Sequence, residues 1–157
     1  MFRKKSSEKS YPKFVPRIKE GYVIKVYDGD TITVASKIPY SFDFNTYSFS
    51  IRLARIDCPE LKSNNEEEKM CAQRVQKELS DILLENRVKL RVNGSDKYGR
   101  LLCEVYFKNV NINDWMLQNH FAVEYDGGTK KSPDSWEAYM SSANPTYFIP
   151  RRTCFLF

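Results

Sequence analysis

The chain has 157 residues, of which 41% are hydrophobic and 29% are charged with both signs mixed, and its formal net charge at pH 7 is +5. This length suits one compact domain, and the mixed composition excludes a wholly disordered chain. No run of residues approaches the roughly 20 apolar positions of a membrane span, and the N-terminus lacks the apolar stretch of a signal peptide. We therefore expect an intracellular protein that does not enter a membrane.

The first 20 residues carry the whole net charge. They contain seven basic and two acidic side chains, so the other 137 residues hold equal numbers of positive and negative groups. Because this segment is rich in lysine, serine and proline, we predict a flexible leader over residues 1–20. The leader is either a solvated arm or a source of salt-dependent attraction to nucleic acid. Phosphate binding by the folded part must then come from individually placed basic side chains.

Two strands are predicted first, over residues 22–27 and 31–36, on either side of an Asp28-Gly29 turn. The pattern of β-branched and polar residues around an Asp-Gly pair is typical of a β-hairpin. A second, unusually aromatic arm follows, because aromatic and apolar residues alternate from Tyr40 to Phe44 and again from Tyr47 to Leu53. The aromatic part over residues 40–49 either extends a substrate groove or packs within the molecule.

The period of the pattern changes after Pro59, which cannot continue a strand ladder. Apolar residues then recur on one helical face and predict a helix over roughly 66–85, with Ser63 or Asn65 as the residue that opens a capping box. Two further strands are predicted over 88–92 and 101–107, a short helix near 111–118, and a last helix that starts at Ser132-Pro133.

Five antiparallel strands, with a helix between the third and the fourth, match the plan of an OB-fold barrel. We therefore predict an α+β fold, a five-stranded antiparallel OB-fold β-barrel with about three helices, over residues 21–143. Residues 144–157 are predicted to be a C-terminal extension. Proteins of this fold commonly bind oligonucleotides, but the fold alone does not decide whether anything is cleaved.

Side chains that could bind metals are few. The four cysteines, at positions 58, 71, 103 and 154, form no CxxC pair, and His120 is the single histidine. A structural zinc site is therefore not expected, and we predict reduced thiols. His120 is predicted to be a surface turn residue.

Three short segments hold polar residues that a barrel does not need for packing: VYDGDT at 26–31, IRLARIDCPE at 51–60 and DKYGR at 96–100. Each segment alone is consistent with an ordinary turn or strand end. Together and in this order they resemble the three signature stretches of the staphylococcal nuclease-like (thermonuclease) family. The similarity runs from about Gly21 to Tyr139.

The resemblance implies a calcium site. In that family the matching positions bind Ca²⁺, which assigns the role of ligand to the carboxylates of Asp30 and Asp57 and to the backbone carbonyl of Cys58. The family usually has threonine at the position of Cys58. An all-oxygen set suits calcium, which tolerates a loose cage completed by water and a substrate phosphate. Asp28 is either a group that supports the ligands or a cap of its turn.

The resemblance also implies the catalytic groups. Glu60 corresponds to the residue that activates the attacking water, and whether it acts as the base or organises the site stays open. Arg52 and Arg100 correspond to the arginines that hold the phosphate and stabilise its developing charge. The reaction implied is attack of water on a phosphodiester bond that expels the 5′-oxygen and leaves a 3′-phosphate.

Three further positions are implied to bind substrate. Lys97 and Tyr98 match positions near a terminal phosphate, and Tyr125 lies close to where the family stacks a base, although the YDGGTK stretch departs from the bacterial pattern. Stacking on aromatic rings tolerates any base. The expected partners are therefore DNA or RNA, single-stranded by preference and with little sequence specificity, bound by a monomer.

Two other functions compete with catalysis. The first is a module of the same fold that binds nucleic acid or protein without cutting, which would not require the complete set of polar residues found here. The second is a structural calcium-binding domain, which would give no reason for Arg52 and Arg100 to face one cleft.

Overall fold

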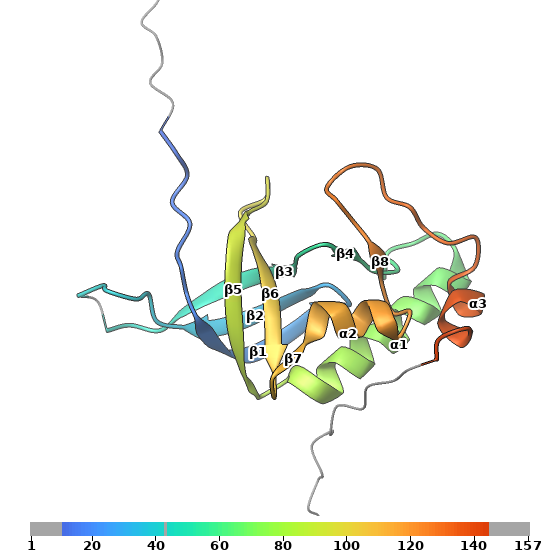
Figure 1. Cartoon of the computed structure of the whole chain (residues 1–157), viewed down its shortest axis with the longest axis horizontal. Helices are drawn as coiled ribbons and strands as arrows, with labels where there is room; N and C mark the ends of the chain where they lie inside the picture. Colours follow the sequence, from blue (N-terminus) through green and yellow to red (C-terminus); the bar gives the residue numbers. More distant parts are fainter. Residues whose placement is uncertain (1–10, 43, 145–157) are drawn as a thin grey trace, which may run out of the picture.

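The computed structural model describes residues 11–42 and 44–144, and Figure 1 shows their arrangement. The strands are β1 Glu20–Asp28, β2 Thr31–Ser36, β3 Tyr47–Leu53, β4 Ile56–Asp57, β5 Arg87–Ser95, β6 Leu101–Phe107, β7 Val110–Asn111 and β8 Val123–Glu124. The helices are α1 Glu66–Leu83, α2 Ile112–Gln118 and α3 Trp136–Ser141.

The main sheet has the strand order β3-β2-β1-β5-β6-β7. Neighbours in this order run antiparallel, and a further parallel pairing of β3 with β6 closes the sheet on itself. Closure removes the exposed edges that an open sheet would leave. The five-stranded OB-fold barrel with three helices, predicted from the sequence, is thereby confirmed. The short strands β4 and β8 pair beside the barrel.

The barrel interior and the inner face of α1 share one hydrophobic core. In β6 buried and partly exposed residues alternate along the whole strand, as expected for a strand with one face on the core. Helix α1 turns its apolar stripe toward this core, and the buried residues of that stripe are Cys71, Ala72, Val75, Leu79, Ile82 and Leu83. The helix therefore lies against the barrel and holds the segment that precedes it.

The two longer connections before α1 and α3 each end at a capping side chain. Of the two caps predicted for α1, Asn65 is the one present, and its side chain accepts from the backbone N–H groups of Glu67 and Glu68. Helix α3 begins at Trp136, capped by Ser135, and not at Ser132 as predicted. The later serine provides the cap, so the loop before α3 is longer than the sequence pattern indicates.

The turn between β1 and β2 contacts α1 directly because Gly29 has no side chain. A Cβ atom at this position would lie 2.7 Å from Cγ1 of Val75 and 2.9 Å from Cβ of Cys58. Such distances are too short for real carbon atoms, so any side chain here would push the turn away. Gly29 thus places its neighbours Asp28 and Asp30 beside the segment that carries Cys58.

The predicted strand character is wrong for residues 40–42 and 44. β2 ends at Ser36, which pairs with Tyr47, so the described residues between the two strands, 37–42 and 44–46, have no partner strand. Tyr40, Phe42 and Phe44 are 97%, 98% and 84% exposed, so these rings do not pack within the molecule. The same register places Arg52 opposite Thr31, and the loop therefore lies at the far end of the β2–β3 pair from Arg52. It does not extend a groove at that arginine.

The folded part begins earlier than the predicted domain boundary. Ile18 is 1% exposed, and the carbonyl of Lys19 accepts from the N–H of Leu90 in β5. The end of the predicted leader therefore belongs to the barrel. Residues 1–10 and the predicted extension after residue 144 lie outside the described residues.

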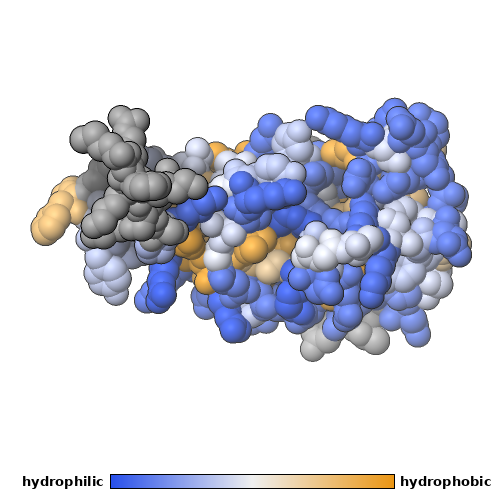
Figure 2. All heavy atoms as spheres, turned by 90° about the horizontal axis from the view of Figure 1, so that it is seen from above, coloured by the Kyte–Doolittle hydropathy of each residue, from blue (hydrophilic) through white to orange (hydrophobic). Residues whose placement is uncertain are grey.

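Cys58, Cys71 and Cys103 are buried and unpaired, and Cys154 is outside the described residues. Figure 2 shows a face on which hydrophilic residues predominate, with hydrophobic ones between them. Within residues 11–42 and 44–144, no helix combines the length and the apolar character that a membrane span would need.

Candidate active site

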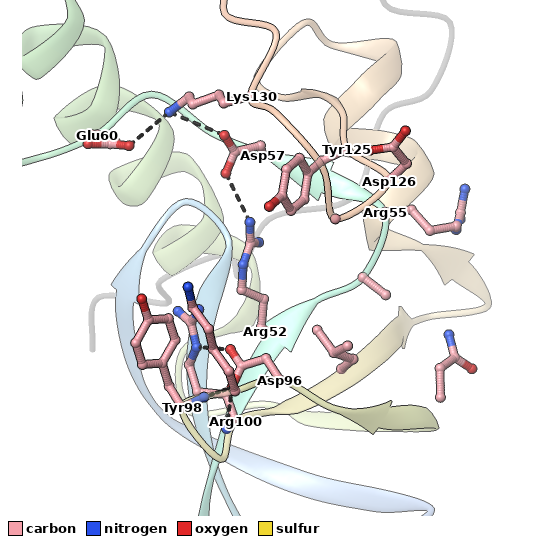
Figure 3. A pocket seen from close by; sticks show the side chains of 15 residues that line it. Arg52, Arg55, Asp57, Glu60, Asp96, Tyr98, Arg100, Tyr125, Asp126 and Lys130 are labelled. Carbon is pink, nitrogen blue, oxygen red and sulfur yellow. Dashed lines mark hydrogen bonds and ion pairs between the residues drawn. The ribbon is translucent and has the colours of Figure 1, made fainter.

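Two adjoining cavities gather the predicted site residues. The smaller, of about 330 Å³ and here called the carboxylate pocket, is lined by Asp28, Asp30, Cys58 and their neighbours. The larger, of about 730 Å³ and here called the open cleft, is lined by side chains from the β5–β6 turn and from the loop after β8, as Figure 3 shows. All nine predicted residues border one cavity or the other, and four border both: Arg52, Asp57, Glu60 and Arg100.

Arg52 joins the two carboxylates that the sequence assigns to the metal. Its Nη1 lies 2.9 Å from Oδ2 of Asp30, and its Nη2 lies 2.9 Å from Oδ1 of Asp57. Nη1 also donates to the carbonyl of Ile56 at 3.0 Å. The planar guanidinium permits this because its donors point in fixed, divergent directions. Arg52 is 9% exposed, so its charge and those of its partners are largely removed from water.

Burial raises the pKa of Asp30 to about 6, although the charge of Arg52 opposes the shift. Oδ1 of Asp30 accepts from the hydroxyl of Thr31 at 2.9 Å. Burial likewise raises the pKa of Asp57, while the charge of Lys130 acts in the opposite direction. Both carboxylates are therefore costly to ionise in the metal-free fold, which is the condition under which an added cation is bound favourably.

We expect a Asp30→Asn variant to reveal this cost in metal-free buffer. Asp30 holds its proton more tightly in the folded state, where its pKa is about 6, than at its ordinary value of 3.8. Its contribution to stability is therefore complete below pH 3.8 and is lost as the pH rises through 6. Urea unfolding at pH 4, 5, 6 and 7 measures the free energy of unfolding of both proteins. Between pH 4 and pH 7, the wild type should lose on the order of 2–3 kcal/mol of this free energy relative to the variant. A difference that stays constant with pH would contradict the assignment.

The atom of Cys58 that could serve as a metal ligand is its backbone carbonyl oxygen and not its thiol sulfur. The side chain is 4% exposed and lies against Gly29, and burial raises the pKa of the thiol well above its ordinary value. The sulfur therefore stays protonated and is a poor ligand. The carbonyl oxygen of Cys58, by contrast, accepts a hydrogen bond from Nζ of Lys130 at 3.1 Å.

The predicted donors suit a hard cation. Two carboxylates and one carbonyl are oxygen ligands of the kind that calcium prefers. In the part of the chain that is described, no three His, Cys, Asp or Glu side chains converge to form a complete metal cluster. A bound ion would thus take its remaining ligands from water or from a substrate phosphate. Asp28 accepts from the N–H of Asp30 at 3.3 Å, which is the contact of a turn cap.

Arg100 is held by Asp96, a residue to which the sequence assigned no role. Oδ2 of Asp96 lies 2.6 Å from Nε of Arg100, and Oδ1 accepts from the backbone N–H groups of Tyr98 and Arg100. Nη1 of Arg100 donates to the hydroxyl of Thr31 at 3.2 Å, which links the β5–β6 turn to the β1–β2 turn. The signal was present, since an aspartate two residues before a tyrosine and three before a glycine is typical of such a turn.

The predicted substrate residues border the open cleft. Tyr98 is 73% exposed, and its ring centroid lies 5.6 Å from Cζ of Arg100 and 5.0 Å from Nζ of Lys97. The ring centroid of Tyr125 lies 5.7 Å from Cζ of Arg52. The cleft thus presents two aromatic rings, each beside one of the two arginines. His120 is a half-buried turn residue stacked on Tyr139, and neither cavity includes it.

Glu60 reaches solvent at the junction of the two cavities. Its side chain is 65% exposed, and its backbone N–H donates to Oε1 of Glu68 at 3.0 Å. Because Glu68 lies in the first turn of α1, the helix fixes the backbone of the candidate base. The carboxylate of Glu60 itself contacts Nζ of Lys130 at 3.2 Å.

Lys130 is the main residue that the sequence did not reveal. Figure 3 shows its side chain reaching from the loop after β8 to Asp57 and Glu60. Burial lowers its pKa, but the charges of these two carboxylates outweigh burial and raise it. The loop sequence around Lys130 carries no motif, and its partners lie about 70 residues earlier, so no local pattern could have found this contact.

Comparison with known proteins is consistent with this geometry. A family model described as "Staphylococcal nuclease homologue" matches residues 50–144. A Haemophilus influenzae protein named "Uncharacterized endonuclease" is 35% identical over 103 residues, which are 66% of this chain and 51% of that protein. A Phaeosphaeria nodorum protein named "Probable endonuclease LCL3" is 28% identical over 93 residues, 59% of this chain and 29% of that protein. The chain thus spans about half of the length of the first relative and less than a third of the second. The family match begins in β3, so Asp30 lies before it.

Proposed function

The chain belongs to the staphylococcal nuclease homologue family, and we propose from this premise that it hydrolyses phosphodiester bonds of DNA or RNA. One observation carries the proposal. Arg52, Arg100 and Glu60 meet where the carboxylate pocket joins the open cleft, so two guanidinium groups and one accessible carboxylate face the same space. Two relatives that carry the name endonuclease support this reading.

We propose that Asp30, Asp57 and the carbonyl of Cys58 hold Ca²⁺. The fit rests on the oxygen donors and on the raised pKa of both carboxylates, which favours a cation beside them. A bound calcium ion would neutralise negative charge on the phosphate and help to orient it. Asp57 also contacts Arg52, so the same carboxylate would connect the metal site to a phosphate-binding guanidinium.

The protein groups divide the remaining work. Glu60 would accept a proton from the attacking water or hold that water in line with the phosphorus atom. Arg52 and Arg100 would bind the phosphate oxygens through paired N–H donors and stabilise the charge that builds up during attack. Expulsion of the 5′-oxygen, which leaves a 3′-phosphate, is the course that the family resemblance implies.

The open cleft suits an unpaired strand. Tyr98 and Tyr125 present rings on which exposed bases can stack, each contributing about 1–3 kcal/mol with little dependence on sequence. Bases inside a duplex do not offer their faces in this way. We therefore propose a preference for single-stranded DNA or RNA, with Lys97 beside the phosphates and a monomer as the active unit.

The proposal predicts that the purified protein degrades single-stranded DNA in calcium and stops when a chelator is added. The products should carry 3′-phosphates and 5′-hydroxyls, so a polynucleotide kinase should label the new 5′ ends without prior phosphatase treatment, and terminal transferase should extend the new 3′ ends only after phosphatase treatment. Gel electrophoresis of labelled oligonucleotides with and without Ca²⁺, from neutral to alkaline pH, provides the measurement. Intact DNA that nevertheless shifts in a binding assay would instead identify a binding module without catalytic activity.

A further inference from the structure

Lys130 places an ammonium group inside the cluster of oxygens proposed for the metal. Its Nζ lies 3.1 Å from the carbonyl oxygen of Cys58, 3.2 Å from Oδ2 of Asp57 and 3.2 Å from Oε1 of Glu60. Oε1 of Glu68 follows at 3.9 Å. The Lys130 side chain is only 25% exposed, so these contacts are partly shielded from water.

Two of the three proposed calcium ligands are therefore also acceptors for Lys130. Asp57 gives one carboxylate oxygen to Arg52 and the other to Lys130, and the carbonyl of Cys58 faces the same ammonium. An ammonium group and a calcium ion both bind hard oxygen atoms. Two cations that contact the same two oxygens lie close together and repel each other strongly. Binding of one cation must weaken binding of the other.

We propose that Lys130 is a built-in competitor of the metal ion, which holds Asp57 and Cys58 while no metal is bound and is released when the metal binds. This inference rests on the calcium site of the proposed function. In this proposal the Lys130 ammonium pairs with the ligand oxygens when the metal is absent, so a residue that is not a ligand lowers the affinity for the metal.

Release of Lys130 would also change the open cleft. Lys130 belongs to the loop over residues 125–135, which supplies Tyr125, Asp126 and Gly127 to the cleft wall. The backbone N–H of Tyr125 stays anchored to the carbonyl of Arg55, and two glycines follow before Lys130. The segment after Tyr125 can therefore move when the ammonium leaves, which couples metal binding to the wall of the substrate cleft.

The competing explanation is that Lys130 is a fixed support for the ligands. The two explanations predict opposite effects of removing the charge. If Lys130 competes with calcium, removing its charge should tighten calcium binding. If Lys130 instead supports Asp57 and Glu60 in the arrangement that the metal needs, removing its charge should weaken calcium binding.

Calorimetric titration of Ca²⁺ into chelator-treated protein separates these explanations without any measurement of activity. We expect Lys130→Met to bind calcium at least fivefold more tightly than wild type, within the roughly 5–150-fold range of coupling between sites. Lys131→Met is the matched control, because it removes the same charge from an exposed neighbour and should change the affinity less than twofold. Equal or weaker binding by Lys130→Met would overturn the proposal.

A second measurement uses the wild-type chain and needs no variant. An amine-reactive reagent, followed by mass spectrometry of peptides, should modify Lys130 more slowly than Lys131 in chelator, and calcium should raise the Lys130 rate toward that of Lys131. An unchanged ratio would contradict release. If calcium binds wild type and Lys130→Met equally, only the competitor role fails. If neither binds calcium, the proposed metal site fails and the competitor role falls with it.

Discussion

Replacing Glu60 with glutamine should lower the rate of phosphodiester cleavage by about 10²–10⁴-fold, the usual contribution of a positioned general base. The variant should fold normally, because the Glu60 side chain is 65% exposed and its amide replacement keeps an oxygen that can accept from Lys130. Single-turnover cleavage of a labelled oligonucleotide in saturating calcium measures the loss, and circular dichroism checks the fold.

Glu66→Gln is the control for this experiment. It removes the same negative charge from a nearby residue of α1, where the side chain is 79% exposed and contacts Lys69 and not the site. Its cleavage rate should stay close to that of wild type. A Glu60→Gln variant with full activity would exclude Glu60 as the general base. A loss confined to KM would mean that Glu60 arranges the substrate, whereas a loss in kcat supports action on the attacking water.

The barrel was predictable where the sequence pattern and the pairing partner coincide. The alternation in β1, β2 and β6 reflects one face on the core, and each of these strands pairs with a neighbour along the sheet. The same alternation at Tyr40 and Phe42 was misleading, because β2 ends at Ser36 and offers nothing to pair with. Alternation of apolar and polar residues is compatible with a strand, but the strand forms only where a neighbouring strand is available to pair with it.

The site, too, has a part that was predictable from the sequence and a part that was not. Its motif residues lie within short segments, so three stretches of sequence were enough to nominate them, and the fold brings them to two adjoining cavities. Lys130 belongs to no motif, and its contacts with Cys58, Asp57 and Glu60 exist only because the loop after β8 folds back over the end of β4. Charge pairing over some 70 residues is set by the tertiary structure, and a single sequence does not display it.

Lysine substitutions at the two arginines should separate a structural role from a catalytic one. Both Arg52→Lys and Arg100→Lys should lower kcat by about 10²–10³-fold, because an ammonium cannot present the paired donors that match phosphate oxygens. Their effects on stability should differ. Arg52 is 9% exposed and bridges Asp30 and Asp57, and lysine cannot span both carboxylates. We expect Arg52→Lys to lose about 1–3 kcal/mol of unfolding free energy.

Arg100 provides the contrast because it is more exposed than Arg52 and pairs with one carboxylate instead of two. Its side chain is 29% exposed and its ion pair is with Asp96, which also accepts from two backbone N–H groups and so keeps partners when the guanidinium is gone. We expect Arg100→Lys to lose less than about 1 kcal/mol. Urea unfolding in chelator, paired with single-turnover cleavage in calcium, measures both quantities. Equal stability of the two variants would show that the Arg52 bridge does not hold the carboxylates together, and the metal site would then have to be organised by other contacts.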